Sequence, residues 1–270
     1  MIGSYLFRYL LKDFYYLITS PEGRSFLKLC AVIGHRNRYE PLSVKVNGFE
    51  WSLPDAMSFL WQYHEIFFLE SYKFKSQMKQ PIIVDCGSNV GLSIYYFKRL
   101  YPYSRVFGFE ADEGVFQYLQ SNVGSLPNVE ISQKAVWVHD QGVSFHTEGA
   151  DGGLINATEQ GNVPSIRLRE VLRDFDHIDM LKMDIEGAEF EVLDDCWEEM
   201  SKVDHLFLEL HTFRKEPQAI GKVLLSLEKS GFRYFVSNEN EIKSPFVTPA
   251  KTMDLQLNVF AYRPEAGSLQ

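Results

Sequence analysis

The chain divides at about residue 80 into two stretches with different patterns of hydrophobic and polar positions. From Pro81 onward, short apolar runs alternate with segments in which apolar residues recur at helical spacing. Short apolar runs are typical of buried strands, and the longer period is that of an amphipathic helix. Strands that alternate with helices favour a parallel sheet, so the pattern predicts an α/β domain over residues 81–270.

The expected helices of this domain begin near Gly91, after Asp112 as N-cap, after Asp184 and near Pro217. The glycine-rich segment Glu148–Pro164 is expected to be a mobile lid, because a polar loop of this length is usually functional or disordered. The expected strands are Ile82–Asp85, Arg105–Phe109, Val129–Val136, Gly142–Thr147, Ile178–Asp184, His205–His211, Phe232–Val236 and Leu255–Tyr262.

Residues 1–80 are rich in aromatic side chains and are expected to form an extension of helices and a β-hairpin. Leu42–Val46 and Phe49–Leu53 alternate between apolar and polar residues on either side of Asn47-Gly48. This dipeptide between alternating segments is a strong indicator of a tight hairpin. A helical pattern follows from about Asp55 to Tyr72.

The first twenty residues are apolar and aromatic, but Arg8, Lys12 and Asp13 interrupt them. No apolar run therefore approaches the ~20 residues that a membrane span needs. No positive segment precedes an apolar core, so a signal peptide is not expected. The segment is interpreted as a helix packed on the domain or on a second subunit of a homo-oligomer, with an interfacial membrane anchor as the alternative.

The net negative charge of the chain disfavours nucleic acid as a partner. The chain carries 27 basic and 36 acidic residues, a formal charge of −9. Phosphate backbones bind clustered lysine and arginine, so nucleic acid is not expected as the main partner. The three widely spaced cysteines form neither a disulfide framework nor a zinc pattern, which fits a cytoplasmic protein.

The most informative motif is the stretch PIIVDCGSNVG, Pro81–Gly91. It reads as a buried strand ending at Asp85, a tight turn with Gly87, and a helix start. Gly87 can adopt backbone angles closed to other residues, and free N–H groups at the helix start could meet a polar ligand edge. The next strand ends at Glu110, where nucleoside-binding α/β units carry the acid that holds the ribose hydroxyls.

The spacing of the glycines separates the candidate nucleosides. Asn89 stands two residues after Gly87, where the dinucleotide fingerprint has its second glycine, so a dehydrogenase is disfavoured. The pattern D-x-G-x-N-x-G resembles the first motif of S-adenosylmethionine-dependent methyltransferases. The predicted donor-binding residues are Asp85, Gly87, Ser88, Asn89, Gly91, Glu110, Ala111 and Ala135.

A second motif, DMLKMDIEGAE, places Asp184 at a strand end and Glu186 in the following turn. Ligands in open α/β sheets bind beyond the carboxyl ends of the strands. Asp85, Glu110 and His211 lie at such ends too, so these polar groups are expected to converge on one edge of the sheet.

Together these motifs resemble the FkbM-type methyltransferase family over about two thirds of the chain, Pro81–Arg263. The resemblance rests on VDCGSNVGLS, FGFEA, LKMDIEGAEFEVL and LFLELH, of which the LKMDIEGAE stretch is the most specific. It implies a class I, Rossmann-like fold with a mostly parallel seven-stranded sheet and an antiparallel last strand. It also implies S-adenosylmethionine as donor and, in most relatives, a hydroxyl oxygen as acceptor.

Transfer to a hydroxyl benefits from a base within hydrogen-bond reach. Asp184 and His211 are the candidates, and Glu209 lies on the same face of its strand as His211. Asp184, Glu209 and His211 could instead bind a divalent metal ion that polarises the acceptor. Glu186 is the remaining candidate for a catalytic role, although Glu186 and Glu189 could simply favour the next helix through its dipole.

The sequence thus predicts a methyltransferase that acts on a small hydroxylated metabolite or a glycan. Transfer to nitrogen or to a protein side chain is the alternative among enzymes. A non-catalytic S-adenosylmethionine-binding protein is the alternative outside them.

Overall fold

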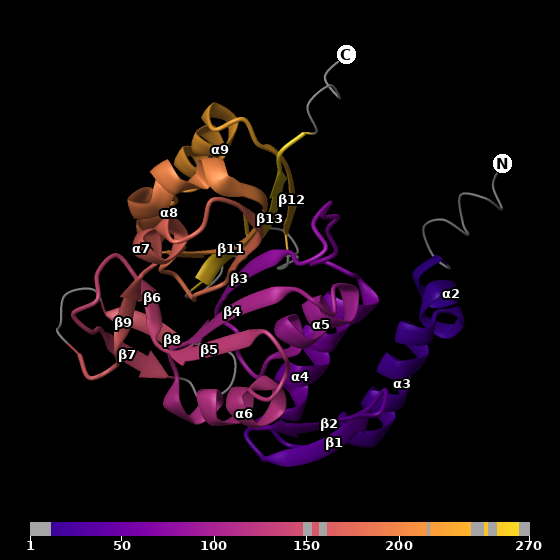
Figure 1. The fold of residues 1–270 in the computed structure, drawn as a ribbon. Helices are drawn as coiled ribbons and strands as arrows, with labels where there is room; N and C mark the ends of the chain where they lie inside the picture. The colour runs from indigo at the N-terminus through magenta and orange to yellow at the C-terminus, as the bar shows by residue number, and fades with distance from the viewer. Residues whose placement is uncertain are drawn as a thin grey trace, which may run out of the picture.

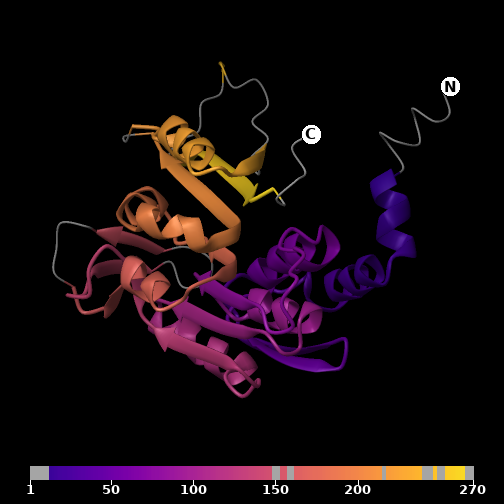
Figure 2. The same cartoon turned by 45° about the horizontal axis from the view of Figure 1, so that its top comes forward.

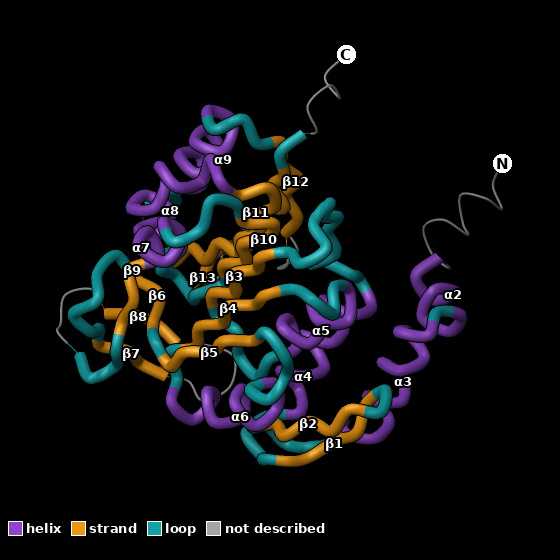
Figure 3. Tube along the Cα trace, viewed as in Figure 1, coloured by secondary structure: helices purple, strands orange, loops and turns teal. Residues whose placement is uncertain are grey.

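The computed structural model describes residues 12–147, 153–156, 161–214, 217–238, 246–247 and 253–264. Its centre is a seven-stranded sheet in the order β12-β13-β11-β10-β3-β4-β5 (Figures 1 and 3). The strands are β3 (Ile82–Cys86), β4 (Arg105–Glu110), β5 (Val129–Gln133), β10 (Ile178–Met183), β11 (Val203–Phe213), β12 (Arg233–Asn238) and β13 (Met253–Tyr262).

Neighbouring strands from β11 to β5 pair in parallel, whereas β13 pairs antiparallel with both β11 and β12. This is the class I methyltransferase arrangement expected from the sequence: a mostly parallel sheet with an antiparallel last strand. The strands β11, β10, β3 and β4 are neighbours in the sheet and run in the same direction. Their carboxyl ends therefore lie side by side at one edge.

Helices cover both faces of the sheet and bury two apolar cores, because adjacent residues of a strand point to opposite faces. Ile83 belongs to the core beneath α4–α6 and its neighbour Val84 to the core beneath α7–α9. The helices are α4 (Ala56–Tyr63), α5 (Leu92–Leu100), α6 (Glu113–Val123), α7 (Leu168–Arg173), α8 (Glu189–Cys196), the 3₁₀ helix Trp197–Lys202 and α9 (Ile220–Lys229).

The predicted hairpin is confirmed as β1 (Leu42–Val46) and β2 (Phe49–Leu53), with positive φ at both Asn47 and Gly48, as a two-residue turn of this kind requires. The predicted helix after Asp55 is shorter than expected. α4 continues as a π-helical turn, His64–Phe68, and then ends, so Tyr72 lies outside it, buried in the core.

The predicted third strand was wrong in its extent. β5 ends at Gln133, and β6 (Ala135–Trp137) leaves the main sheet to pair with β9 (Ser165–Arg167). The predicted lid also contains a strand, since β8 (Gly153–Asn156) pairs antiparallel with β7 (Ser144–Thr147). Residues 148–152 and 157–160 of that segment lie outside the described residues, so its role as a lid stays a prediction.

The extension shares the core of the domain rather than forming one of its own. Its Trp51, Phe59 and Phe67 join the cluster beneath α5 and α6. α3 (Pro21–Ile33) joins this core through Leu29 and Ile33. α2 (Lys12–Thr19) projects from the body in both views (Figures 1 and 2). The predicted division at residue 80 stays a prediction.

The described part of the N-terminal segment does not pack on the domain as a buried helix. Phe14, Tyr15, Tyr16 and Ile18 are all exposed, although the ring of Tyr16 reaches Phe68. Contact with a second subunit stays a prediction. Within the described ranges, no helix has the length and apolar character that crossing a bilayer requires.

Candidate functional site

A cavity of about 360 Å³ lies beyond the carboxyl ends of β3, β4, β10 and β11, within the range of about 300–1,000 Å³ usual for ligand sites. Asp85 and Gly91 do not line it; a side chain at Gly91 would meet Val123 at 2.9 Å, so this glycine permits the packing of α5 on α6. The predicted site residues that line the cavity are Gly87, Ser88, Asn89, Glu110, Ala111, Ala135, Asp184, Glu186, Glu209 and His211.

The glycine turn after β3 offers no free backbone donor between residues 87 and 91. The N–H groups of Gly87 and Ser88 donate to the carbonyl of Phe109, at 3.0 and 2.9 Å. The N–H of Asn89 donates to the carboxylate of Glu110, and that of Val90 donates to the side-chain oxygen of Asn89. The N–H of Gly91 donates to the carbonyl of Ser88. The turn itself therefore lacks the cradle of donors that a pyrophosphate needs. The expectation of free N–H groups concerned the start of the helix, which begins at Leu92, and it stays a prediction.

Asp85 is fully buried behind this turn and faces a lysine that the sequence analysis overlooked. The carboxylate accepts a hydrogen bond from Ser93 at 2.6 Å. The Nζ atom of Lys182, also buried, lies 3.7 Å from Asp85 Oδ1 and 3.2 Å from Asp184 Oδ2. It donates to the carbonyl of Gly87 at 2.6 Å, so Lys182 ties the first motif to the second.

Glu110 lines the cavity beside the glycine turn and holds that turn in place. Its two carboxylate oxygens each accept a backbone N–H at 2.9 Å, one from Asn89 and one from Asp112. Burial raises the pKa of Glu110 to about 7, against the opposing effect of these hydrogen bonds. The residue is thus both a cavity wall and a structural link between β4 and the turn.

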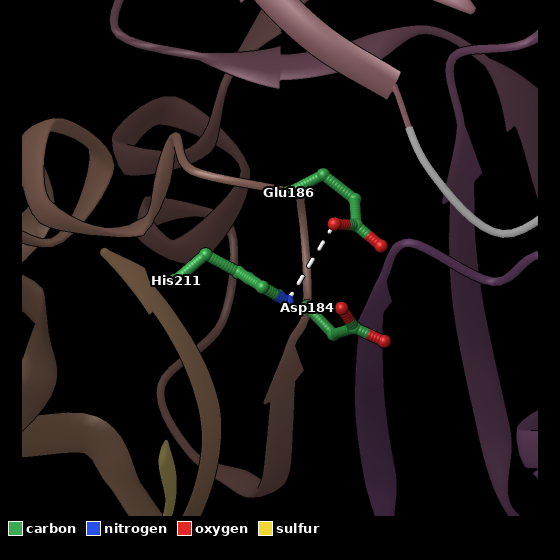
Figure 4. A group of neighbouring side chains, drawn as sticks. All are labelled: Asp184, Glu186 and His211. Carbon is green, nitrogen blue, oxygen red and sulfur yellow. Dashed lines mark ion pairs between the residues drawn. The ribbon is translucent and has the colours of Figure 1, made fainter. Parts of the chain in front are cut away.

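Four acidic side chains surround His211 at the other end of the cavity, and Figure 4 shows two of them, Glu186 and Asp184. His211 Nε2 lies 3.5 Å from Glu186 Oε2 and 3.3 Å from Glu209 Oε1. The two β11 residues share a face of their strand, as their spacing predicts. The convergence predicted for the second motif and His211 is therefore confirmed.

Glu189 is the fourth acid and was interpreted from the sequence only as a residue that favours a helix start. It is fully buried, and its Oε1 lies 3.2 Å from His211 Nδ1. The backbone N–H groups of Ile185 and Gly187 also donate to this carboxylate. Glu189 therefore fixes the orientation of the imidazole and directs Nε2 toward the cavity.

The acids change the protonation of the cluster. Burial by itself would lower the pKa of His211, but hydrogen bonds to Glu189 and Glu209 and the charge of Glu186 raise it to about 12. Burial and the charge of Asp184 raise the pKa of Glu186 to about 9. Near neutral pH the imidazole thus carries a second proton, which makes it an ion-pair partner rather than a free base.

The same groups could hold a metal ion that takes the place of the Nε2 proton of His211. One ligand atom each from Asp184, Glu186 and His211 lie within 4.8 Å of one another, so Glu186 takes the place in this group that was predicted for Glu209. Carboxylates with one imidazole suit a divalent cation such as Mn²⁺. The contact between His211 Nδ1 and Glu189 is the carboxylate–histidine pairing that orients metal-bound histidines.

Comparison with known proteins identifies the family of the chain. The family model "Methyltransferase FkbM domain" matches residues 85–234, more than half of the chain. Methyltransferase sdnD of Sordaria araneosa is 26% identical over 171 residues, and 2-O-methyltransferase NoeI of Sinorhizobium fredii is 25% identical over 152. Each match covers 48% of this chain but less than two thirds of the relative, 66% and 63%.

The fold also matches solved structures. A S-adenosylmethionine-dependent methyltransferase from Agrobacterium tumefaciens superimposes with a TM-score of 0.51 over 86% of this chain and 72% of its own, at 10% sequence identity. At this level of identity the likeness concerns the fold alone.

Proposed function

Because this chain belongs to the FkbM methyltransferase family, we propose that it transfers a methyl group from S-adenosylmethionine to a hydroxyl oxygen of a small metabolite or glycan. One observation carries the proposal: a single cavity joins the glycine turn and Glu110 at one end to the cluster around His211 at the other. A donor at the first end would present its methyl group toward the second.

The residues present suit this donor. It carries no phosphate, and the turn at Gly87 has no free N–H groups to bind one. Its sulfonium and ammonium are positive, and six carboxylates line the cavity. Glu110 would accept from the ribose hydroxyls, while Ala111 and Ala135 leave room beside it. Asn89 and Ser88 complete this end of the cavity.

The donor supplies a methyl carbon that the positive sulfonium has already activated. The chain has to hold the acceptor oxygen within about 3–3.5 Å of that carbon and in line with it, and to take up the acceptor proton. Asp184 is the candidate for the proton, since its carboxylate faces the cavity and His211 is already protonated. Lys182 holds Asp184 in position through the 3.2 Å contact with Oδ2.

A divalent cation at Asp184, Glu186 and His211 is the second part of the proposal. The geometry of the three ligand atoms and the buried Glu189 behind His211 favour it. Bound there, the cation would polarise the acceptor hydroxyl and ease its deprotonation. 2-O-methyltransferase NoeI, named for transfer to oxygen, supports a hydroxyl acceptor.

The test is transfer of labelled methyl from S-adenosylmethionine to pools of hydroxylated metabolites and oligosaccharides, with and without chelator. We expect a labelled product that survives mild alkali, as a methyl ether does and a methyl ester does not. Asp184→Asn should lower turnover by at least the ~10² typical of lost acid–base assistance and leave donor affinity nearly unchanged. Label found only on nitrogen or protein would contradict a hydroxyl acceptor.

A chelator distinguishes activation of the acceptor by a divalent cation from base catalysis by Asp184 alone. Loss of turnover that Mg²⁺ or Mn²⁺ restores supports the cation, and turnover indifferent to chelator leaves Asp184 as the base. Donor binding without transfer to any acceptor would instead favour the non-catalytic alternative.

A further inference from the structure

One wall of the cavity comes from the extension, outside the residues that match the family model. Trp61, Gln62 and Glu65 of α4 and the π-helical turn line it. Trp61 is 58% exposed, whereas Trp51 and Trp137 are buried and Trp197 is half-buried. A tryptophan exposed to this degree at the rim of a cavity offers a flat apolar face without closing the entrance.

The indole of Trp61 is held rather than loose. The guanidinium carbon of Arg38 lies 5.5 Å from the centre of its ring. Arg38 is fixed in turn by Asp55, with Nε to Oδ2 at 3.0 Å, and by Ser58 at 3.3 Å. Asp55 is itself buried and caps α4 through the N–H of Ser58. An aromatic platform fixed in advance loses little entropy when a ligand stacks on it.

Polar groups continue from this platform toward the catalytic end of the cavity. The π-helical turn places Glu65 on the cavity wall, where it accepts a hydrogen bond from Asn258 of β13 at 3.1 Å. Such turns inside helices are frequent at functional sites. Gln256, two residues before Asn258, lines the cavity and donates to Glu209 beside His211. Amide and carboxylate side chains thus connect Trp61 to the reacting end.

The charge of the cavity limits the acceptor. Six acidic side chains outnumber its three basic ones, Lys134, Lys182 and the protonated His211. The Nζ of Lys182 already contacts Asp184 and a carbonyl. A phosphorylated or carboxylated acceptor would be repelled. The indole of Trp61 is largely exposed, so it does not form the two-sided slot that a flat aromatic acceptor would fit. The lining acids are Glu65, Glu110, Asp112, Asp184, Glu186 and Glu209.

We propose that Trp61, Gln62 and Glu65 form the acceptor subsite and that this subsite takes an uncharged sugar ring. The C–H face of the ring lies on the indole, and its hydroxyls bind the amide of Gln62 and the carboxylate of Glu65. A sugar ring presents an apolar face of C–H groups and an edge of hydroxyls. An aromatic ring suits the face, and amide and carboxylate side chains beside it suit the edge. This inference rests on the proposed function and names its acceptor class.

The first test compares Trp61→Ala and Trp61→Phe with Tyr103→Ala as a matched control. Tyr103 is another exposed aromatic residue, 69% exposed and away from the cavity. With neutral oligosaccharides as acceptors, Trp61→Ala should lower kcat/KM by roughly tenfold or more, mainly through KM. Trp61→Phe should retain most of the activity, and the control and donor affinity should not change. Equal KM values in wild type and Trp61→Ala would overturn the subsite.

The second test needs no turnover. Acrylamide quenching reports mainly on Trp61, the most exposed of the four tryptophans. With S-adenosylhomocysteine present, methyl glycosides of glucose, galactose, mannose and rhamnose should protect it, and Trp61→Phe should abolish the protected fraction. Hexose 6-phosphates and phenol should not protect. If phenol alone protects Trp61, or if none of the glycosides does, the sugar subsite is wrong even when methyl transfer occurs. If the glycosides protect Trp61 but no methyl group is transferred, only the proposed function is wrong.

Discussion

Glu110 holds the glycine turn and is proposed to bind the donor ribose, so its protonation should control donor binding. Burial raises its pKa to about 7, and only the ionised carboxylate can accept from both ribose hydroxyls. Below pH 7 binding must first remove a proton, so the Kd for S-adenosylhomocysteine should rise about tenfold per pH unit as the pH falls. Glu110→Gln should bind more weakly and lose this pH dependence, which calorimetric titration at several pH values measures. A wild-type Kd constant from pH 5.5 to 8 would contradict a ribose role.

Glu189 acts on the reacting end only through His211. It is fully buried, and its carboxylate meets His211 Nδ1 and two backbone N–H groups. Glu189→Gln keeps the size but weakens the contact that directs Nε2, so metal affinity or turnover should fall about 10–100-fold, as for comparable partners of metal ligands. Donor affinity, measured on the same sample, should stay the same. Unchanged turnover at all Mn²⁺ concentrations would show that Glu189 supports only the fold.

Most of the candidate site could be predicted residue by residue, because polar groups at the ends of parallel strands must meet at one edge. Asp184, Glu209 and His211 illustrate this. Lys182 and Glu189 were missed because their roles depend on partners far away in the sequence. A lysine inside the apolar strand β10 was the available signal for Lys182. Glu189 carried no comparable signal, since acids in a first helical turn are common for reasons of the dipole.

At the scale of elements, the turn after β3 requires glycine at position 87 for two reasons: its positive φ angle and the lack of room for a side chain. Gly87 and Gly48 have similar φ angles, +81° and +86°, but a Cβ at Gly87 would lie 1.8 Å from the carbonyl oxygen of Asp184, whereas one at Gly48 meets nothing within 4 Å. Gly48→Ala should therefore cost about 1–2 kcal/mol in the free energy of unfolding. Gly87→Ala should cost about 1–3 kcal/mol more. Urea denaturation compares them, and equal losses would refute the close packing of the two motifs.

Local patterns predicted elements well where the pattern and the packing agree. The hairpin β1–β2 appears with the expected bounds because Asn47 and Gly48 tolerate the positive φ that its turn needs. The expected strand over Val129–Val136 fails because β6 continues the apolar run but pairs outside the main sheet, with β9. Apolar alternation shows that a segment is extended, whereas its strand partner is set by tertiary contacts.

At the scale of the whole molecule, the sheet order places the donor end and the reacting end on opposite sides of one cavity. β3 and β4 carry the glycine turn and Glu110, while the adjacent β10 and β11 carry Asp184 and His211. The extension closes the third side with Trp61 and packs into the same core as α5 and α6. Sequence patterns predicted the order of elements in this domain but not this wall, because Trp61 lies on an aromatic-rich helix where most aromatic residues are core.

The most direct measurement of the central claim is calorimetric titration of the full chain with S-adenosylmethionine, S-adenosylhomocysteine and NAD. We expect the first two to bind at one site, with the pH dependence that Glu110 imposes. NAD should not bind, because the turn at Gly87 has no free N–H groups for a pyrophosphate. Binding of NAD without binding of S-adenosylmethionine would contradict the central claim.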